Sequence, residues 1–330
     1  MQSVVGKKIV TIGGGTGGFT VNRGLRNYPV VPTAICTVFD SGGSSGILRD
    51  EFGSLPPGDI RRCLLALADD REDTLREMFQ YRFTNGHAPT ALADHSLGNL
   101  LLLASEKIWG PIEGIRRLSR VLGLEGAVLP ISTDSAHLCA ELSDGSTIVG
   151  ETTIDLRPLE DERLVKKVWL EPNAVICRDA AKAIMEADVI VLGPGDLYTS
   201  IIPNLLVSGT ADAIAQSKAR LVYVANLMTK WSETRDFTLE DFLKTLLSYG
   251  IGRERFDAVL INQNGIPAEL LPLYAQKDKS SPVLFTKEME ANLHVYTKDI
   301  VVDNFLSKTG LEQKLIRHDS GKLAKRIIEL

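Results

Sequence analysis

Residues that could bind a ligand are densest between Asp40 and Arg62. Glycines in this stretch allow positive φ and a close approach of backbone to ligand, and short hydroxyl side chains donate or accept hydrogen bonds. Arginines can pair with an anionic ligand or, equally well on sequence grounds, with neighbouring surface acids. The residues are Asp40, Ser41, Gly42, Gly43, Ser44, Ser45, Gly46, Arg49, Asp59, Arg61 and Arg62. Their chemistry suits phosphates or sugar hydroxyls.

Two regular elements must hold this stretch in place. Thr33 to Phe39 is a β-branched, apolar run of strand length, and Ile60 to Leu67 repeats apolar residues at the spacing of one helix face. We predict the order strand, polar loop, helix, with Asp59 as the carboxylate that caps the helix. Asp40, at the end of the strand, could bind a ribose, orient a metal or cap the loop.

An earlier glycine-rich loop lies between a predicted strand at Lys8 to Ile12 and a predicted helix that runs to Leu25. Its spacing satisfies G-x-G-x-x-G, which in a βαβ unit places a phosphate over a helix N-terminus. The candidate ligand residues are Gly13, Gly14, Gly15, Thr16 and Gly17. Two alternatives stay open. One is an NAD site, although Asp40 lies somewhat further along the chain than the acid that usually binds the ribose in such sites. The other is a tight turn that only packs the helix on the strand.

Polar residues also follow later predicted elements. A loop over residues 84–89 is followed by Asp94-His95-Ser96-Leu97-Gly98-Asn99, which opens an apolar helix; His95 is either a helix-start residue bonded to backbone or an acid–base residue. Gly193 and Gly195 follow the apolar strand Val189 to Leu192. Asn226 and Asn262 close two further strands. Because ligands bind at the carboxyl ends of parallel strands, these ends predict one site built from several loops.

The alternation of strands and helices predicts a doubly wound, mainly parallel α/β sheet of Rossmann-like type with helices on both faces. Asp144-Gly145 between His137 to Leu142 and Thr147 to Glu151 predicts a β-hairpin. We expect one domain over residues 1–330, with the hairpin as an insertion at about 136–151.

Composition narrows the classes of function. A net charge of −5 without a block of Lys or Arg argues against nucleic-acid binding, and no run approaches membrane-spanning length. We therefore expect a cytoplasmic protein with a small-molecule ligand. The four cysteines lack any C-x-x-C pairing, which favours buried thiols over zinc ligands or disulfides. Motifs of P-loop ATPases, zinc proteases and esterases are also missing from the sequence.

Seven motifs together resemble those of the YvcK-type gluconeogenesis factor family, in the same order and over nearly the whole chain. They are GGGTGG, DSGGSSG-x-LRDEFG-x-LPPGDIR, HSLGNLLL, VLPISTD, VLGPG-x-LYTSIIPNLL, NLMT-x-x-x-ET and IRHDS. The larger superfamily includes the 2-phospho-L-lactate transferases, also called CofD proteins, which have a Rossmann-like fold. No settled reaction comes with this resemblance.

The resemblance implies a cytoplasmic factor for growth and cell shape on gluconeogenic carbon sources, able to bind UDP-N-acetylglucosamine. It implies nucleotide-sugar contacts at Tyr274 and Arg317 and a phosphorylatable residue at Ser320. A protein partner in cell-wall synthesis or carbon metabolism, and a homo-oligomer, stay open. The ligand set expected from residues and resemblance together is Gly13, Gly14, Gly15, Thr16, Gly17, Asp40, Gly42, Gly43, Ser44, Ser45, Arg49, Asp59, Arg62, Asn99, Gly193, Gly195, Asn226, Tyr274 and Arg317.

The chain departs from the family pattern at two places. Relatives usually carry Asp-Asp before the glycines where this chain has Asp40-Ser41, and one carboxylate fewer weakens the expectation of Mg²⁺ there. The first loop ends Gly-Gly-Phe where relatives commonly have Gly-Leu-Ser. We name no metal ligand and no catalytic residue. The alternatives to a nucleotide-sugar-binding regulator are a phosphoryl or nucleotidyl transferase that uses GTP or GDP, and an NAD-binding protein.

Overall fold

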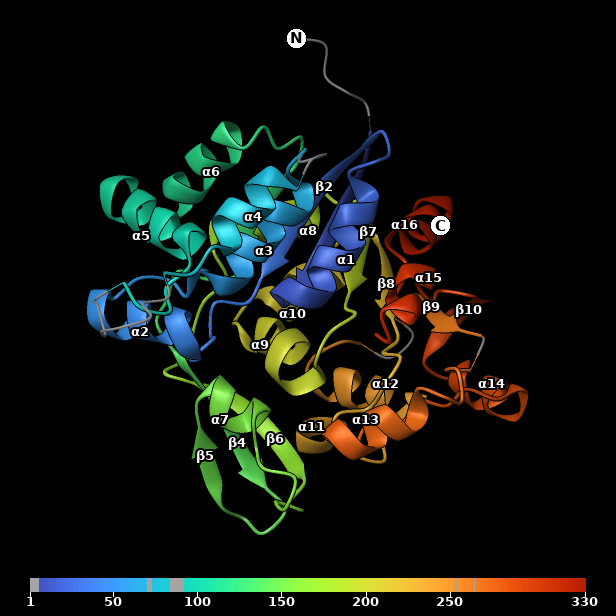
Figure 1. Cartoon of the computed structure of the whole chain (residues 1–330). Coiled ribbons are helices and arrows are strands. Elements are labelled where there is room, and N and C mark those ends of the chain that lie inside the picture. Colours follow the sequence, from blue (N-terminus) through green and yellow to red (C-terminus); the bar gives the residue numbers. More distant parts are fainter. Residues whose placement is uncertain (1–5, 70–72, 84–91, 253–254, 264) are drawn as a thin grey trace.

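A computed structural model describes residues 6–69, 73–83, 92–252, 255–263 and 265–330. The predicted loop at 84–89 lies outside the described residues. A seven-stranded parallel sheet in the order β10-β9-β8-β7-β1-β2-β3 forms the centre (Figure 1). Its strands are β1 (Lys7–Gly13), β2 (Val30–Cys36), β3 (Ala127–Pro130), β7 (Val189–Leu192), β8 (Arg220–Val224), β9 (Phe256–Asn262) and β10 (Thr297–Asp303). The predicted doubly wound α/β fold is confirmed.

The order of strands reverses between β1 and β7. From β1 the chain builds outward through β2 to β3, and it then returns to β7 and builds through β8 and β9 to β10. The pairs of β1 with β2 and with β7 are both parallel. Loops that leave two neighbouring strands in opposite directions open a crevice at their carboxyl ends, which is where α/β folds of this kind bind ligands.

Helices cover both faces of the sheet. Alternate strand residues such as Ile9 and Val191 pack against α1 (Gly15–Leu25) and α16 (Ser320–Glu329), which lie side by side. Residues on the opposite face pack against α8 (Arg178–Met185), α9 (Ile202–Leu206), α10 (Thr210–Gln216) and α12 (Leu239–Ser248). A capping box formed by Thr238 and Asp241 begins α12.

The other helices are α2 (Gly43–Phe52), α3 (Pro57–Leu67), α4 (Thr74–Gln80), α5 (Leu97–Trp109), α6 (Pro111–Val121), α7 (Glu151–Asp155), α11 (Trp231–Thr234), α13 (Leu271–Asp278), α14 (Lys287–Leu293) and α15 (Lys308–Glu312), with a π-helical turn η1 (Leu197–Ile201). None of the helices in the described part of the chain combines the length and apolar character that crossing a bilayer requires.

A second, antiparallel sheet of three strands lies below the first in Figure 1, in the order β5-β4-β6. It consists of β4 (His137–Leu142), β5 (Thr147–Val149) and β6 (Val165–Glu171). Strands β4 and β5 form the hairpin that Asp144-Gly145 indicated. Helix α7 follows β5 directly and contacts β4, so the hairpin delivers the acidic residues of α7 to the main sheet.

Two local predictions are wrong. The stretch after Asp40 contains a helix, α2, where we predicted only a loop; it ends at Gly53 in the left-handed conformation, whose N–H bonds the carbonyl of Arg49. Its sequence gives little helical periodicity because Leu48 is its one buried large apolar residue. Asp59 is not the N-cap of α3. The helix begins at Pro57, whose missing N–H suits a first helical turn, and Asp59 therefore lies inside that turn.

Candidate functional site

The loops after β1 and β7 touch at the strand-order reversal so closely that only glycine fits. A Cβ on Gly17 would lie 1.5 Å from the carbonyl oxygen of Pro194, and a Cβ on Gly15 would lie 2.6 Å from a carboxylate oxygen of Asp59. The predicted loops around Gly13 to Gly17 and Gly193 to Gly195 therefore form one wall. The Cβ positions of Gly14, Gly15 and Gly17 are thus filled by protein groups, whereas no atom of the described residues lies within 4 Å of a Cβ built on Gly13, so backbone is open to a ligand there.

The loop after β2 places Asp40 beside the start of α3. The Oδ1 atom of Asp40 accepts the N–H of Gly42 at 2.8 Å. A Cβ on Gly58 would lie 3.2 Å from Asp40 Oδ2 and 2.6 Å from Ser45 Oγ. Ser45 Oγ in turn accepts the N–H of Gly58 at 3.1 Å. Asp40 thus faces the same crevice as the first glycine loop.

Asp59 is a buried carboxylate at the centre of this crevice. Burial raises its pKa to about 6, the charge of Asp40 adds to that rise, and Arg62 together with a hydrogen bond from Gly15 N–H opposes it. Arg62 NH1 lies 3.2 Å from Asp59 Oδ1, and the Arg62 side chain is about half exposed. The guanidinium therefore sits at the mouth of the crevice and supplies its nearest positive charge on this side.

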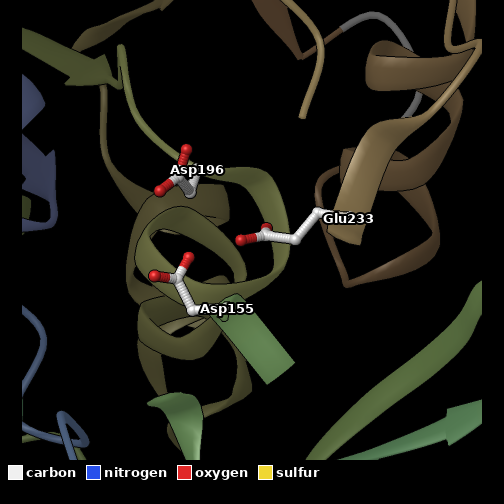
Figure 2. A group of neighbouring side chains, drawn as sticks. All are labelled: Asp155, Asp196 and Glu233. Carbon is white, nitrogen blue, oxygen red and sulfur yellow. The ribbon is translucent and has the colours of Figure 1, made fainter. Parts of the chain in front are cut away.

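Three more carboxylates converge next to these loops, and sequence reasoning did not assign them. Asp155 of α7, Asp196 of the loop after β7 and Glu233 of α11 have ligand atoms that all lie within 4.8 Å of one another. Figure 2 shows their carboxylates turned toward a common space. We call these three residues the carboxylate cluster. They come from three separate elements, which only the tertiary fold brings together.

Lys230 supplies the counter-charge to the carboxylate cluster. Its ammonium contacts Asp155, lies 2.7 Å from Asp196 and lies 3.4 Å from Glu233. Glu233 is also fixed by η1: it accepts the N–H of Tyr198 at 2.8 Å and the hydroxyl of Thr199 at 2.7 Å. One ammonium among three carboxylates leaves the cluster net negative.

The acids of the crevice raise one another's pKa values. Desolvation and the charges of Glu233, Glu151 and Asp59 raise the pKa of Asp196 well above its ordinary value. Burial and the charge of Asp40 raise the pKa of Glu151, the first residue of α7, to about 7. A site with this excess of oxygen ligands and negative charge suits a hard divalent cation such as Mg²⁺, which binds carboxylates together with phosphate oxygens.

Ser44 and Asn99, two of the predicted ligand residues, face each other away from Asp40. Ser44 Oγ lies 2.8 Å from Nδ1 of His95 and accepts the side-chain N–H of Asn99 at 3.0 Å. All three side chains are buried. They fasten α2 to the start of α5. The ring of His95 therefore bonds a side chain, Ser44, and not the backbone as predicted for a helix-start residue.

Two of the predicted arginines bond to protein. Arg49 pairs with the surface acid Asp50 at 2.8 Å, and its side chain is largely buried. Arg61 is buried and donates to Ser96 and to the carbonyl of Phe79. Of the arginines in this stretch, only Arg62 combines exposure with a position at the crevice.

The C-terminal residues implied by the resemblance gather beside the ends of β8 and β9. The Tyr274 hydroxyl accepts the N–H of Ile316 at 2.8 Å, which ties α13 to the loop that carries the exposed Arg317. Burial lowers the pKa of the next residue, His318, to about 4, and a hydrogen bond to the carbonyl of Ala225 opposes that shift. Asn226 donates to the carbonyl of Gly195 at 2.8 Å. This group therefore adjoins the loop after β7.

Ser320 lies at the first position of α16, apart from the crevice. The preceding Asp319 caps the helix by accepting the N–H of Lys322 at 2.9 Å. A Cβ on Gly24 would lie 2.0 Å from the carbonyl oxygen of Ser320, so the start of α16 packs tightly against α1.

Fold and site together define an α/β protein of the Rossmann-like type, with glycine loops and acidic side chains gathered at its strand-order reversal. The profile of the family described as "2-phospho-L-lactate transferase CofD" matches residues 9–301. A protein from Nostoc sp. is 47% identical over 327 residues, which cover 98% of this chain and 68% of that protein. "Gluconeogenesis factor" from Bacillus subtilis is 39% identical over 98% of both chains.

A solved structure agrees with these relatives. The crystal structure of a UPF0052 family member from Bacillus halodurans is 40% identical, with a TM-score of 0.87 over 98% of this chain and 99% of that one. The chain belongs to the CofD family and, within it, to the gluconeogenesis factors. The family resemblance stated from the seven motifs is therefore confirmed.

Proposed function

We propose that this protein is a cytoplasmic gluconeogenesis factor that binds UDP-N-acetylglucosamine and passes on its level to carbon metabolism or cell-wall synthesis. The observation that carries the proposal is the contact of the glycine loops after β1 and β7 at the strand-order reversal. These contacts leave Gly13 open at the end of β1 beside the start of α1, and a diphosphate could approach the helix there. The names of the relatives support the role, and the resemblance in the C-terminal motifs supports the choice of ligand.

The negative charge of the crevice means that a diphosphate needs a positive partner to bind there. A diphosphate carries negative charge, and it must approach Asp40, Asp59 and the carboxylate cluster, whose balance is already negative. A divalent cation between carboxylate and phosphate oxygens removes this conflict. Asp40 and Asp59 from one side, or Asp196 and Glu151 from the other, are the residues that would hold it. We therefore propose Mg²⁺ as part of the bound ligand.

A series of thermal unfolding measurements tests the proposal, because a ligand that binds only the folded state raises the melting temperature. The ligands are UDP-N-acetylglucosamine, UDP, GTP, GDP and NAD, each with and without Mg²⁺. The proposal requires a rise with the UDP-sugar that is larger than that with the other nucleotides. A response to NAD alone would reject it in favour of a dinucleotide site.

A transferase of the phospholactate type is the second candidate, because buried acids with raised pKa values are typical of catalytic sites. In this function Asp59 and Glu151 would exchange protons near neutral pH. The two candidates differ in the fate of the ligand: the regulator returns it unchanged, whereas the transferase turns it over with Mg²⁺ and loses that turnover in Asp40→Ala. Recovery of intact ligand after long incubation would exclude the enzyme for that ligand.

Ser320 remains the proposed regulatory residue. A phosphate at the first position of α16 would lie at a helix N-terminus, where negative charge is favourable, but beside Asp319, where it is not. It would also adjoin Arg317, three residues earlier. Mass spectrometry of the protein from its own cells tests the assignment, and a consistent absence of phosphate there would remove it.

A further inference from the structure

A cavity of about 90 Å³ lies at the carboxyl ends of β8 and β9. The strand ends contribute Asn226, Asn262 and Gln263, and the segment from Pro282 to Phe285 forms the opposite side. The cavity borders the loop after β7, because Asn226 donates to the carbonyl of Gly195 at 2.8 Å. It is therefore one strand away from the proposed position of the diphosphate.

The lining of this cavity differs from the rest of the crevice because none of its described residues is charged. Leu227, Ile261 and Phe285 give apolar walls, and carboxamides stand between them. The two asparagines are held by backbone: Asn262 accepts the N–H of Phe305 at 2.9 Å, as Asn226 bonds Gly195. Gln263 is exposed, and within the described residues its carboxamide makes no hydrogen bond.

These features specify a ligand group. A flat neutral ring gains from apolar walls, and a carboxamide offers both a donor and an acceptor to an edge that presents N–H and C=O groups. A uracil ring has that edge and no charge. Charged phosphates do not match apolar walls without a charged side chain.

A second cavity, of about 50 Å³, lies on the other side of the reversal, near the ends of β2 and β3. It is lined in part by Arg49, Glu106 and Asp134. Its charges and smaller volume suit a neutral base less well than the cavity beside β8 and β9.

We propose that the cavity at the ends of β8 and β9 binds the uracil base of the nucleotide and that the Gln263 carboxamide bonds its imide edge. This inference rests on the proposed function, to which it adds the position of the base. It places the loop of Arg317 beside the nucleoside, because His318 contacts the carbonyl of Ala225, which lines the cavity.

A ring added beside the cavity is a test that leaves the fold intact. No atom of the described residues lies within 4 Å of a Cβ built on Gly265, an exposed lining residue, so Gly265→Phe adds a ring to the lining without a clash. Gly252 is equally open and lies before the amino end of β9, so Gly252→Phe is the matched control. Gln263→Leu removes the hydrogen-bonding group and keeps a similar volume. Unfolding temperatures of the ligand-free variants check that each is folded.

The probes are UDP-N-acetylglucosamine and UMP, titrated by calorimetry in Mg²⁺. We expect Gly265→Phe to weaken both by at least about tenfold, Gln263→Leu to weaken both by about tenfold, and Gly252→Phe to leave both unchanged. Undiminished binding by Gly265→Phe, or an equal loss in Gly252→Phe, would overturn the assignment of the cavity.

The two probes separate this inference from the proposed function. If the unmodified protein binds the UDP-sugar and Gly265→Phe binds it equally well, the base lies elsewhere and the function stands. If the protein binds UMP, loses it in Gly265→Phe and never binds the UDP-sugar, the cavity assignment stands and the choice of sugar nucleotide fails. Binding of neither probe rejects both.

Discussion

A carboxyl group that is buried among other acids lowers the stability of a protein whenever it is ionised, and Asp59 is such a group. Its pKa is about 6 in the folded chain, against 3.8 for an unperturbed aspartate. Between these values the folded state holds more protons than the unfolded state, so this group makes stability fall as pH rises from about 4 to 6. A residue kept at that cost is a candidate for function rather than for folding.

Replacing this acid should therefore stabilise the protein. We expect Asp59→Asn to raise the free energy of unfolding by about 3 kcal/mol at pH 7.5, since one pKa unit corresponds to about 1.4 kcal/mol and the pKa of about 6 already includes the opposing effect of Arg62. The gain should shrink toward zero at pH 4. Urea unfolding at both pH values measures it, with Asp50→Asn, an exposed acid, as the control. A loss of stability at pH 7.5 would show that the charge of Asp59 supports the fold.

Lys230 has the opposite effect on stability. Without its ammonium, the carboxylate cluster keeps three acids and no counter-charge, so we expect Lys230→Met to cost about 2 kcal/mol at pH 7.5. The loss should shrink as pH falls, because desolvation and the neighbouring acids raise the pKa of Asp196 and so favour its protonated form. Lys244→Met removes an exposed pair with Glu240 and should cost under about 0.5 kcal/mol. Equal losses in both variants would contradict this account.

At the scale of elements, the segment that follows α7 is fastened onto α11. Ser232 Oγ donates to the carbonyl of Asp155 at 2.8 Å, and the Trp231 indole donates to the carbonyl of Asp161 at 3.2 Å. Arg157 lies between them, buried, and donates to the carbonyls of Ser232 and Arg163. These bonds fix the relative positions of Asp155 and Glu233, and so they build the carboxylate cluster.

Loss of this arginine should loosen both elements together. We expect Arg157→Met to destabilise the protein by about 3 kcal/mol, because the carbonyls of Ser232 and Arg163 lose a buried donor and Asp161 loses one of its two guanidinium partners. Amide exchange should accelerate around residues 231–235. Arg163 also pairs with Asp161 but is 40% exposed, so Arg163→Met should cost less than about 1 kcal/mol. Unchanged exchange at α11 in Arg157→Met would refute the coupling.

The sequence was enough to predict elements whose signal is local. The apolar strand Val189 to Leu192 and the capping box at Thr238 could be read directly, because apolar runs and capping residues act over a few positions. Helix α2 could not, since small polar residues and one buried leucine carry no helical period. Its helical form depends on contacts with α3 and α5.

The candidate site likewise contains residues that could be predicted from the sequence and residues that could not. The meeting of the glycine loops could be predicted, because parallel strands place their carboxyl ends along one edge. Asp40 was predicted at the end of its strand, but β2 ends at Cys36 and Asp40 lies in the loop that follows. Asp155 and Lys230 could not be assigned, since their roles appear only when α7 and α11 meet. Glu233 did carry a signal: it is the acid of the NLMT-x-x-x-ET motif, which we used for resemblance and not for chemistry.

At the scale of the whole molecule, the three-stranded sheet has a clear part in the site. Its hairpin ends where α7 begins, so Glu151 and Asp155 reach the edge of the main sheet from outside the alternating α/β pattern. Both sheets therefore contribute acids to one crevice, with Lys230 between them. Protonation of these acids must therefore be linked to the binding of a cation and a nucleotide, because each of these events changes the net charge of the crevice.

This linkage predicts how the affinity for the nucleotide changes with pH. The affinity should change in opposite directions when the nucleotide binds with a divalent cation and when it binds without one. Near pH 6.5, Asp59 and Glu151 are partly protonated, since their pKa values are about 6 and about 7. A divalent cation that binds with the nucleotide lowers these values and expels protons, so affinity should rise by about tenfold between pH 5.5 and 7.5. Without a cation the ionised acids repel the diphosphate, and affinity should instead fall as pH rises.

Calorimetry of UDP-N-acetylglucosamine binding in Mg²⁺ distinguishes binding with a cation from binding without one. Titrations at pH 6.5 in two buffers with different enthalpies of ionisation give the number of protons that are released or taken up. We expect release of about one proton per ligand, and much less release at pH 8.5, where both carboxyls are already ionised. Asp59→Asn should lower the release at pH 6.5, whereas Asp50→Asn should not. Uptake of protons in place of release would mean that the nucleotide binds without the cation, and that the excess of acids serves some other purpose.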